Sequence, residues 1–139
     1  MPIEARHPAP SSEPYPSPPW HRAAGWGLSG LTIAFLLFDA LSKIALERHV
    51  IAATTQIGYP VHTIRPIGIT LLVITILYAI PRTAVLGAIL LTGFLGGAVA
   101  SKVRIDDPVF SSVLFGVYVG IAGWLGLWLR DARVRALLD

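Results

Sequence analysis

The stretch TAVLGAILLTGFLGGAVAS, residues 83–101, decides how this chain folds. It contains no charged residue, and as a helix rising ~1.5 Å per residue it would measure about 29 Å. This length matches the ~30 Å hydrocarbon core of a bilayer. Backbone groups in lipid have no water to bond with, so a single segment that crosses the bilayer must be helical. We therefore predict that residues 83–101 form a transmembrane helix.

Three further apolar runs cover residues 23–42, 66–80 and 109–129, and Asp39 is the only charged residue inside them. Over the whole chain 54% of residues are hydrophobic and 14% are charged, whereas soluble domains carry ~25% charged residues. The mean hydropathy of +0.66 agrees with this bias. The pattern predicts an all-α transmembrane bundle of four helices. An up-down-up-down order is expected because Pro81 and Arg82 are almost all that separates two of the runs.

The segments outside the spans are expected to differ in character. Residues 1–22 hold seven of the eleven prolines, so we expect a disordered tail before a membrane domain at residues 23–139. The linker at residues 43–65 has apolar residues at helical spacing: Leu46, Val50, Ala53 and Ile57. We predict an amphipathic helix in the membrane interface, with a frayed loop as the alternative.

Several functions are disfavoured by composition. The chain has no cysteine, which excludes thiol chemistry and cysteine-ligated metals. Its four histidines lie outside the spans, so a bis-histidine haem would lack ligands. The basic residues are scattered rather than gathered in a stripe, so no nucleic-acid partner is expected. We predict no metal site and no catalytic residue.

One polar site is predicted where the first span ends. Asp39 and Lys43 are four residues apart, on the same helix face, and can form an ion pair. Lys102 and Arg104 should lie on the same side of the membrane. Ionisable residues at membrane depth are candidates for function, but a pair near a span end can equally be structural. The sequence leaves both interpretations open.

Small residues recur along the third and fourth spans and predict close helix packing. The positions are Ala84, Ala88, Thr92, Gly93, Gly96, Gly97, Gly116 and Gly120. We expect the helix at residues 83–101 to be the one most enclosed by its neighbours. Self-association into a homodimer through one of these ridges is the alternative use.

An even number of spans puts both termini on one side of the membrane. Six basic residues fall on the terminal side and five on the other. The arginine cluster at residues 130–135 favours cytoplasmic termini in a bacterial cell membrane, since basic residues concentrate on the cytoplasmic side.

Four segments together resemble the DoxX-like family of small bacterial membrane proteins. They are FLLFDALSK at residues 35–43, QIGYP at 56–60, PRTAVLGAILLTGFLGGAVA at 81–100 and LWLRDARVRALL at 127–138. The resemblance covers residues 24–138 and implies a four-helix bundle in a bacterial cytoplasmic membrane. The wider family includes a small subunit of a thiosulfate:quinone oxidoreductase and membrane partners of oxidative-stress complexes.

The resemblance also implies what this chain lacks. Relatives often carry a carboxylate near Thr70 and Leu71, and a histidine at the position of Lys102. We therefore expect a non-catalytic membrane protein, an accessory subunit of a redox complex with a membrane protein partner. The alternatives are a small proton-coupled exporter that uses Asp39, and a quinone-linked oxidoreductase subunit. No cofactor is predicted, quinone being the one candidate.

Overall fold

The computed structural model describes residues 18–138, which are helical and contain no strand. Four long helices dominate: α1 (Pro19–Ile44), α3 (Val61–Ala79), α4 (Ala84–Arg104) and α5 (Phe115–Arg130). Three short elements complete the fold: α2 (Arg48–Gln56), the π-helical turn η1 (Val109–Val113) and α6 (Ala132–Ala136). Four segments are long and apolar enough to cross a membrane, the fourth being η1 and α5 together. The predicted all-α membrane bundle is confirmed.

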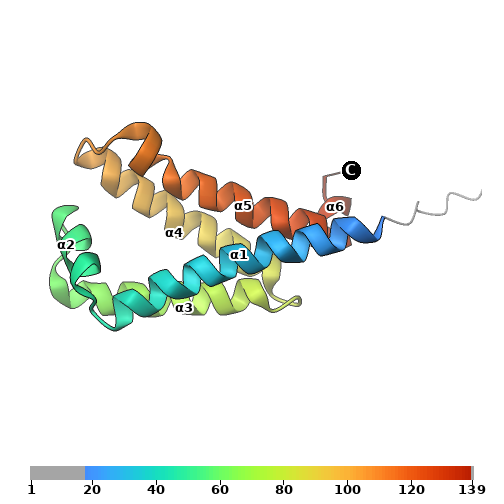
Figure 1. Ribbon diagram of the computed structural model, residues 1–139, viewed down its shortest axis with the longest axis horizontal. Coiled ribbons are helices and arrows are strands. Elements are labelled where there is room, and N and C mark those ends of the chain that lie inside the picture. Colours follow the sequence, from blue (N-terminus) through green and yellow to red (C-terminus); the bar gives the residue numbers. More distant parts are fainter. Residues whose placement is uncertain (1–17, 139) are drawn as a thin grey trace, which may run out of the picture.

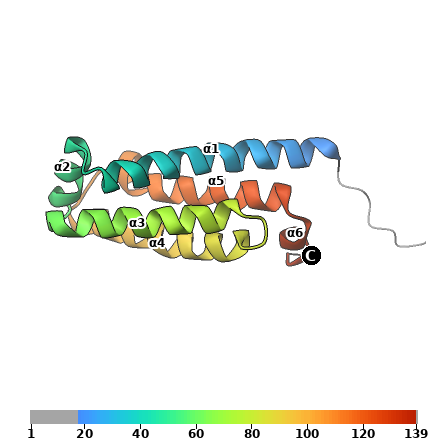
Figure 2. The same ribbon diagram turned by 90° about the horizontal axis from the view of Figure 1, so that it is seen from below.

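The four long helices form a bundle in which α1 packs against α3 and α5, while α4 packs against the same two helices. The start of α1, the α3–α4 turn and α6 lie at one end of the molecule (Figures 1 and 2). We call this end the α6 end. Helix α2 and the turn between α4 and η1 lie at the opposite end, the α2 end (Figure 1).

Helix α1 begins at Pro19, four residues before residue 23, the expected start of the first span. A proline is tolerated here because the first turn of a helix does not use its backbone N–H groups. Pro18 is the N-cap and Pro19 the first helical residue. The rest of the predicted tail, residues 1–17, lies outside the described residues.

Helix α3 begins five residues before the expected start, and Pro66 lies inside it. The prediction placed the start of this span at Pro66, directly after the charged Arg65. Proline lacks a backbone donor and crowds the preceding turn, so a proline inside a helix destabilises it. That boundary is wrong, and packing explains why. Ile64, one turn from the start of α3, is completely buried, so the extra turn contributes apolar contacts that offset the missing hydrogen bond.

The linker after α1 contains the predicted helix, now α2, and not a frayed loop. Glu47 caps it: the carboxylate accepts hydrogen bonds from the backbone N–H groups of His49 and Val50. A hydrogen bond with the His49 ring is the main reason that the pKa of Glu47 lies below its usual value. The position of α2 in the membrane interface stays a prediction.

The sequence predicted one continuous helix for the fourth span. The structure instead divides this span into η1 and α5. Its first turn, η1, is π-helical: the N–H of Val113 bonds to the Pro108 carbonyl and that of Leu114 to the Val109 carbonyl. Pro108 starts the segment and Leu114 separates it from α5. An apolar run alone does not distinguish these hydrogen-bond patterns, so the interruption was invisible in the sequence.

Candidate functional site

The predicted ion pair on α1 forms. Lys43 Nζ donates a hydrogen bond to Asp39 Oδ1, and the side chains are 16% and 34% exposed. The pair lies where α1 crosses α3, since a Cβ on Gly68 would come within 2.7 Å of Lys43 Cβ. Nearby, Arg65 of α3 donates to the Ile44 carbonyl at the end of α1. The pair and this bond both lie at the α2 end of the α1–α3 contact.

Lys102 and Arg104 serve a different junction. Lys102 Nζ donates to the Ser112 carbonyl in η1 at 3.3 Å, and Arg104 donates to the Ile57 carbonyl at 2.6 Å. Gly58 has φ +96°, and a Cβ there would lie 2.7 Å from the Arg104 guanidinium. Arg104 therefore ties the end of α4 to the segment after α2, and the positive φ of Gly58 is a conformation that favours glycine.

The four predicted polar residues do not form one constellation. Within residues 18–138, no hydrogen bond or ion pair links Asp39 or Lys43 to Lys102 or Arg104. The first pair lies within α1, next to its contact with α3. Lys102 and Arg104 hold α4 to η1 and to the α2–α3 turn. No group of three metal-binding side chains occurs in the described part of the chain.

A buried polar cluster near the α6 end was not predicted. The Tyr78 hydroxyl donates to the Gly123 carbonyl at 2.6 Å and bonds with Ser29 Oγ at 3.1 Å. Arg130 is 8% exposed and donates to the Tyr78 carbonyl at 2.8 Å. Its guanidinium carbon lies 4.4 Å from the centre of the Trp26 ring, a cation–π contact. This cluster joins α1, α3 and α5.

The sequence held only a weak signal for this cluster. Trp26 and Arg130 each lie near the end of a span, where aromatic and basic residues are common. Nothing in their spacing shows that they meet. The contact depends on the packing of α1 against α5, which brings Gly25 against the backbone of Arg130; a Cβ on Gly25 would lie 2.6 Å from the Arg130 nitrogen.

Helix α6 is held to the bundle by a second polar set. Asp131 caps α6 by accepting from the Arg133 N–H, and its carboxylate pairs with the Arg133 guanidinium at 3.0 Å. The hydrogen bond between the Asp131 and Arg133 side chains is the main reason that the pKa of Asp131 is lowered and the pKa of Arg133 is raised. Arg133 also donates to the Pro81 carbonyl. Val134 is buried in the same cluster as Tyr78 and Leu127.

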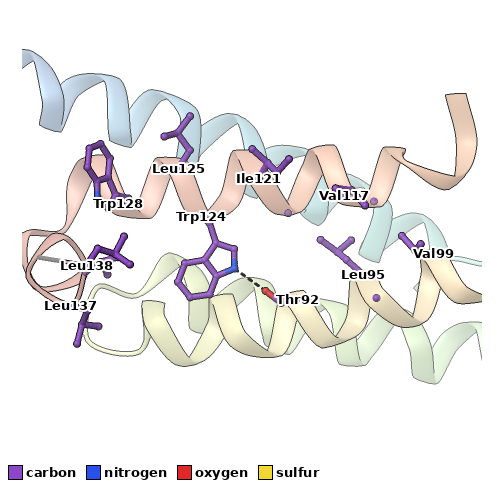
Figure 3. A pocket seen from close by; sticks show the side chains of 14 residues that line it. Thr92, Leu95, Val99, Val117, Ile121, Trp124, Leu125, Trp128, Leu137 and Leu138 are labelled. Carbon is purple, nitrogen blue, oxygen red and sulfur yellow. Dashed lines mark hydrogen bonds between the residues drawn. The ribbon is translucent and has the colours of Figure 1, made fainter. Parts of the chain in front are cut away.

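Between α4 and α5 the structure has a groove of about 660 Å³ with an almost entirely apolar lining. Gly96 lines it on α4, and Gly116 and Gly120 line it on α5. Figure 3 shows the Trp124 indole reaching across, where Nε1 donates to Thr92 Oγ1 at 2.8 Å. Leu137 and Leu138 lie at one end of this groove, which we call the α4–α5 groove.

The predicted packing residues fall into two groups. Ala84 and Ala88 are buried in the bundle, and a Cβ on Gly116 or Gly120 would touch side chains of α4. By contrast, Cβ atoms added to Gly93, Gly96 and Gly97 would meet nothing within 4 Å. The expectation that α4 is the helix most enclosed by its neighbours is wrong, because 33% of the α3 span is buried inside the bundle and only 28% of the α4 span. The small residues near the start of α4 are buried, and Gly93, Gly96 and Gly97 lie open.

The four apolar spans define the class of this protein: it is a multi-pass α-helical membrane protein. Residues 27–126 match the family model of the DoxX-like family, and the chain belongs to that family. The resemblance found in the sequence is thus confirmed. Neither the curated proteins nor the solved structures contain a match.

Proposed function

We propose that this protein is a non-catalytic subunit that packs through the exposed face of α4 against a partner in a membrane redox complex. It would reside in the bacterial cytoplasmic membrane with its termini in the cytoplasm. The observation that carries the proposal is the open glycine pair Gly93 and Gly97. Two glycines four residues apart leave a strip where another helix backbone can approach closely.

The exposed strip is unusual for a surface that meets only lipid. Elsewhere on α4 the lipid-facing positions carry large apolar side chains, such as Leu86, Ile89 and Leu90. Glycine in a helix interior is less stable than alanine by about 0.5–1 kcal/mol. A second helix lying on Gly93 and Gly97 would offset that cost through close packing.

The exporter alternative receives less support from the geometry. A proton-coupled exporter needs a carboxylate that is free to exchange its proton or bind a cation. Asp39 is already paired with Lys43 on the same helix. The Asp39–Lys43 pair also lies in the last turns of α1, toward one end of the span.

The test is crosslinking in native membranes followed by mass spectrometry of the purified complex. We expect a stoichiometric partner that carries a bound redox cofactor, seen by its visible absorbance. Substituting leucine at both glycines (Gly93→Leu, Gly97→Leu) should abolish recovery of this partner. The matched control is Gly30→Leu on α1, where a Cβ also meets nothing within 4 Å. Recovery of the chain alone, or only as a homodimer, would overturn the proposal.

A further inference from the structure

The α4–α5 groove has the size of a ligand site and the lining of a lipid site. Its volume of about 660 Å³ falls within the range of small-molecule pockets. The walls expose apolar carbon almost throughout, with glycine on both helices widening the space. Where Thr92 and Trp124 supply polar atoms, these atoms bond to each other. An occupant of the groove therefore needs an apolar body.

The length of the groove selects among apolar occupants. Along α5 it extends from Gly116 to Trp128, about 18 Å at ~1.5 Å per residue. A transmembrane helix from another chain would need a groove of ~30 Å, the full hydrocarbon thickness. One leaflet contributes half of that, about 15 Å. The groove thus fits a chain that enters from one membrane surface and stops near the midplane.

The charges show from which surface such a chain would enter. The groove ends at the α6 end, where Leu137 and Leu138 line it. Between residues 18 and 138 this end carries a single carboxylate, that of Asp131. The same end carries five arginines: Arg22, Arg82, Arg130, Arg133 and Arg135. The α2 end carries five basic residues and four acidic residues.

Two of these arginines are placed to meet a headgroup. Arg133 donates a hydrogen bond to the carbonyl of Pro81, the residue before Arg82. This bond places the Arg133 guanidinium at the α3–α4 turn. The Arg133 side chain is 66% exposed although it pairs with Asp131. Arg82 is exposed, with no ion pair in the described part of the chain. Arginine binds phosphate well because its planar group offers paired donors.

We propose that the α4–α5 groove holds one acyl chain of an anionic phospholipid whose phosphate lies among the arginines of the α6 end. The argument does not depend on the accessory-subunit role, which uses Gly93 and Gly97 on an adjacent face. The lipid would fill the gap where α4 and α5 separate, and would link α6 to both helices. Anionic lipid is abundant on the cytoplasmic side of membranes, which agrees with cytoplasmic termini.

The chain-binding part is tested by a pair of variants on one helix. Gly96→Leu puts a side chain into the groove, and Gly93→Leu puts the same side chain outside it; neither Cβ meets an atom within 4 Å. Purified protein would be mixed with phosphatidylglycerol and examined by native mass spectrometry. We expect one retained lipid on the unaltered protein and on Gly93→Leu, and at least a fivefold loss of that lipid on Gly96→Leu.

The headgroup part is tested with phosphatidylcholine that has the same acyl chains. We expect the unaltered protein to retain phosphatidylglycerol preferentially. The double variant Arg82→Gln, Arg133→Gln should lower that preference about fivefold for each arginine, since each basic residue near an anionic surface contributes about that factor. The control is Arg48→Gln, Arg65→Gln at the α2 end, which should keep the preference.

Four results would overturn the proposal. Equal retention of both lipids by the unaltered protein would remove the role of the arginines. Equal retention by Gly96→Leu and Gly93→Leu would place the lipid outside the groove. Loss of a dimer in Gly96→Leu would assign the groove to a second copy, and an isoprenoid quinone in place of phospholipid in the purified protein would assign it to that molecule. Failure of the accessory-subunit role would instead appear as loss of the crosslinked partner with lipid retention intact.

Discussion

Glycine has opposite uses on two sides of the bundle. The first side is formed by α1, α3 and α5, and the second by α4 and α5. On the first side, glycines allow backbones to touch, since a Cβ on Gly126 would lie 2.9 Å from the Ser29 nitrogen. The start of α4 meets α3 in the same way, because a Cβ on Gly87 would overlap the backbone of Tyr78. On the second side, Gly96 faces empty space and Gly120 meets only the tip of Leu95 at 3.6 Å.

The difference teaches that glycine in a membrane helix has at least two structural roles. Where helices cross closely, the missing side chain permits van der Waals contact and interhelical hydrogen bonds, which hold helices together in lipid. Where helices diverge, the missing side chain leaves a groove. The same residue type therefore stabilises one interface and opens the other, and four substitutions test this contrast.

The largest effect is expected from Gly87→Ala. Its added methyl group would overlap the backbone of Tyr78, which cannot move aside as a flexible side chain could. We expect a loss of about 3 kcal/mol in stability, because overpacking against backbone forces the helices apart. The thermal midpoint in detergent would measure it. Gly93→Ala is the control and should stabilise the protein by about 0.5–1 kcal/mol. Equal midpoints for the two variants would contradict the contrast.

Next in size is Tyr78→Phe on the tightly packed side. The change removes the hydroxyl that donates to Gly123 and bonds with Ser29, both inside the bundle. We expect a loss of about 2 kcal/mol, since buried partners are left unsatisfied. Tyr118→Phe removes an exposed hydroxyl with a long 3.5 Å contact and should change the midpoint little. A neutral Tyr78→Phe would show that water replaces the lost bonds.

A smaller loss is expected on the open side from Thr92→Val. The change removes the acceptor of the Trp124 N–H and keeps the shape of the side chain. Interhelical hydrogen bonds in membranes contribute about 0.6 kcal/mol on average, so we expect a loss of that order. Thr70→Val is the control because Thr70 bonds only within α3. Equal unfolding of both variants in a denaturant series would show that the Thr92–Trp124 bond does not join α4 to α5.

The smallest effect concerns α6 and depends on pH. Arg133 lowers the pKa of Asp131 in the folded protein. The Asp131 carboxylate therefore stabilises α6 above about pH 4, and this stabilisation is lost as the pH falls through the lowered pKa. We expect α6 to loosen in acid, and only slightly, because solvent screens the exposed Arg133 guanidinium of the pair. Hydrogen exchange at residues 132–136 would measure the opening. Asp131→Asn should show opening that varies less with pH; an unchanged pH profile would contradict this assignment.

The candidate site was predictable where it is local. Asp39 and Lys43 lie one helical turn apart, so helix geometry alone brings them together. The sequence placed Lys102 and Arg104 at the correct end of the bundle, but it did not reveal their partners. Arg104 bonds to a carbonyl 47 residues away in the chain. Such contacts depend on how α2 and its flanking turns fold back, which apolar periodicity does not encode.

Sequence alone determined that the chain forms four membrane-spanning helices and belongs to the DoxX-like family, because lipid requires long apolar helices wherever the chain crosses. Only the tertiary structure decided which small residues pack and which lie open. Ala88 is buried and Gly96 is exposed although both lie on the predicted ridge of α4. The physical reason is that packing depends on the angle and distance between helices, and these follow from all the side chains at the crossing together.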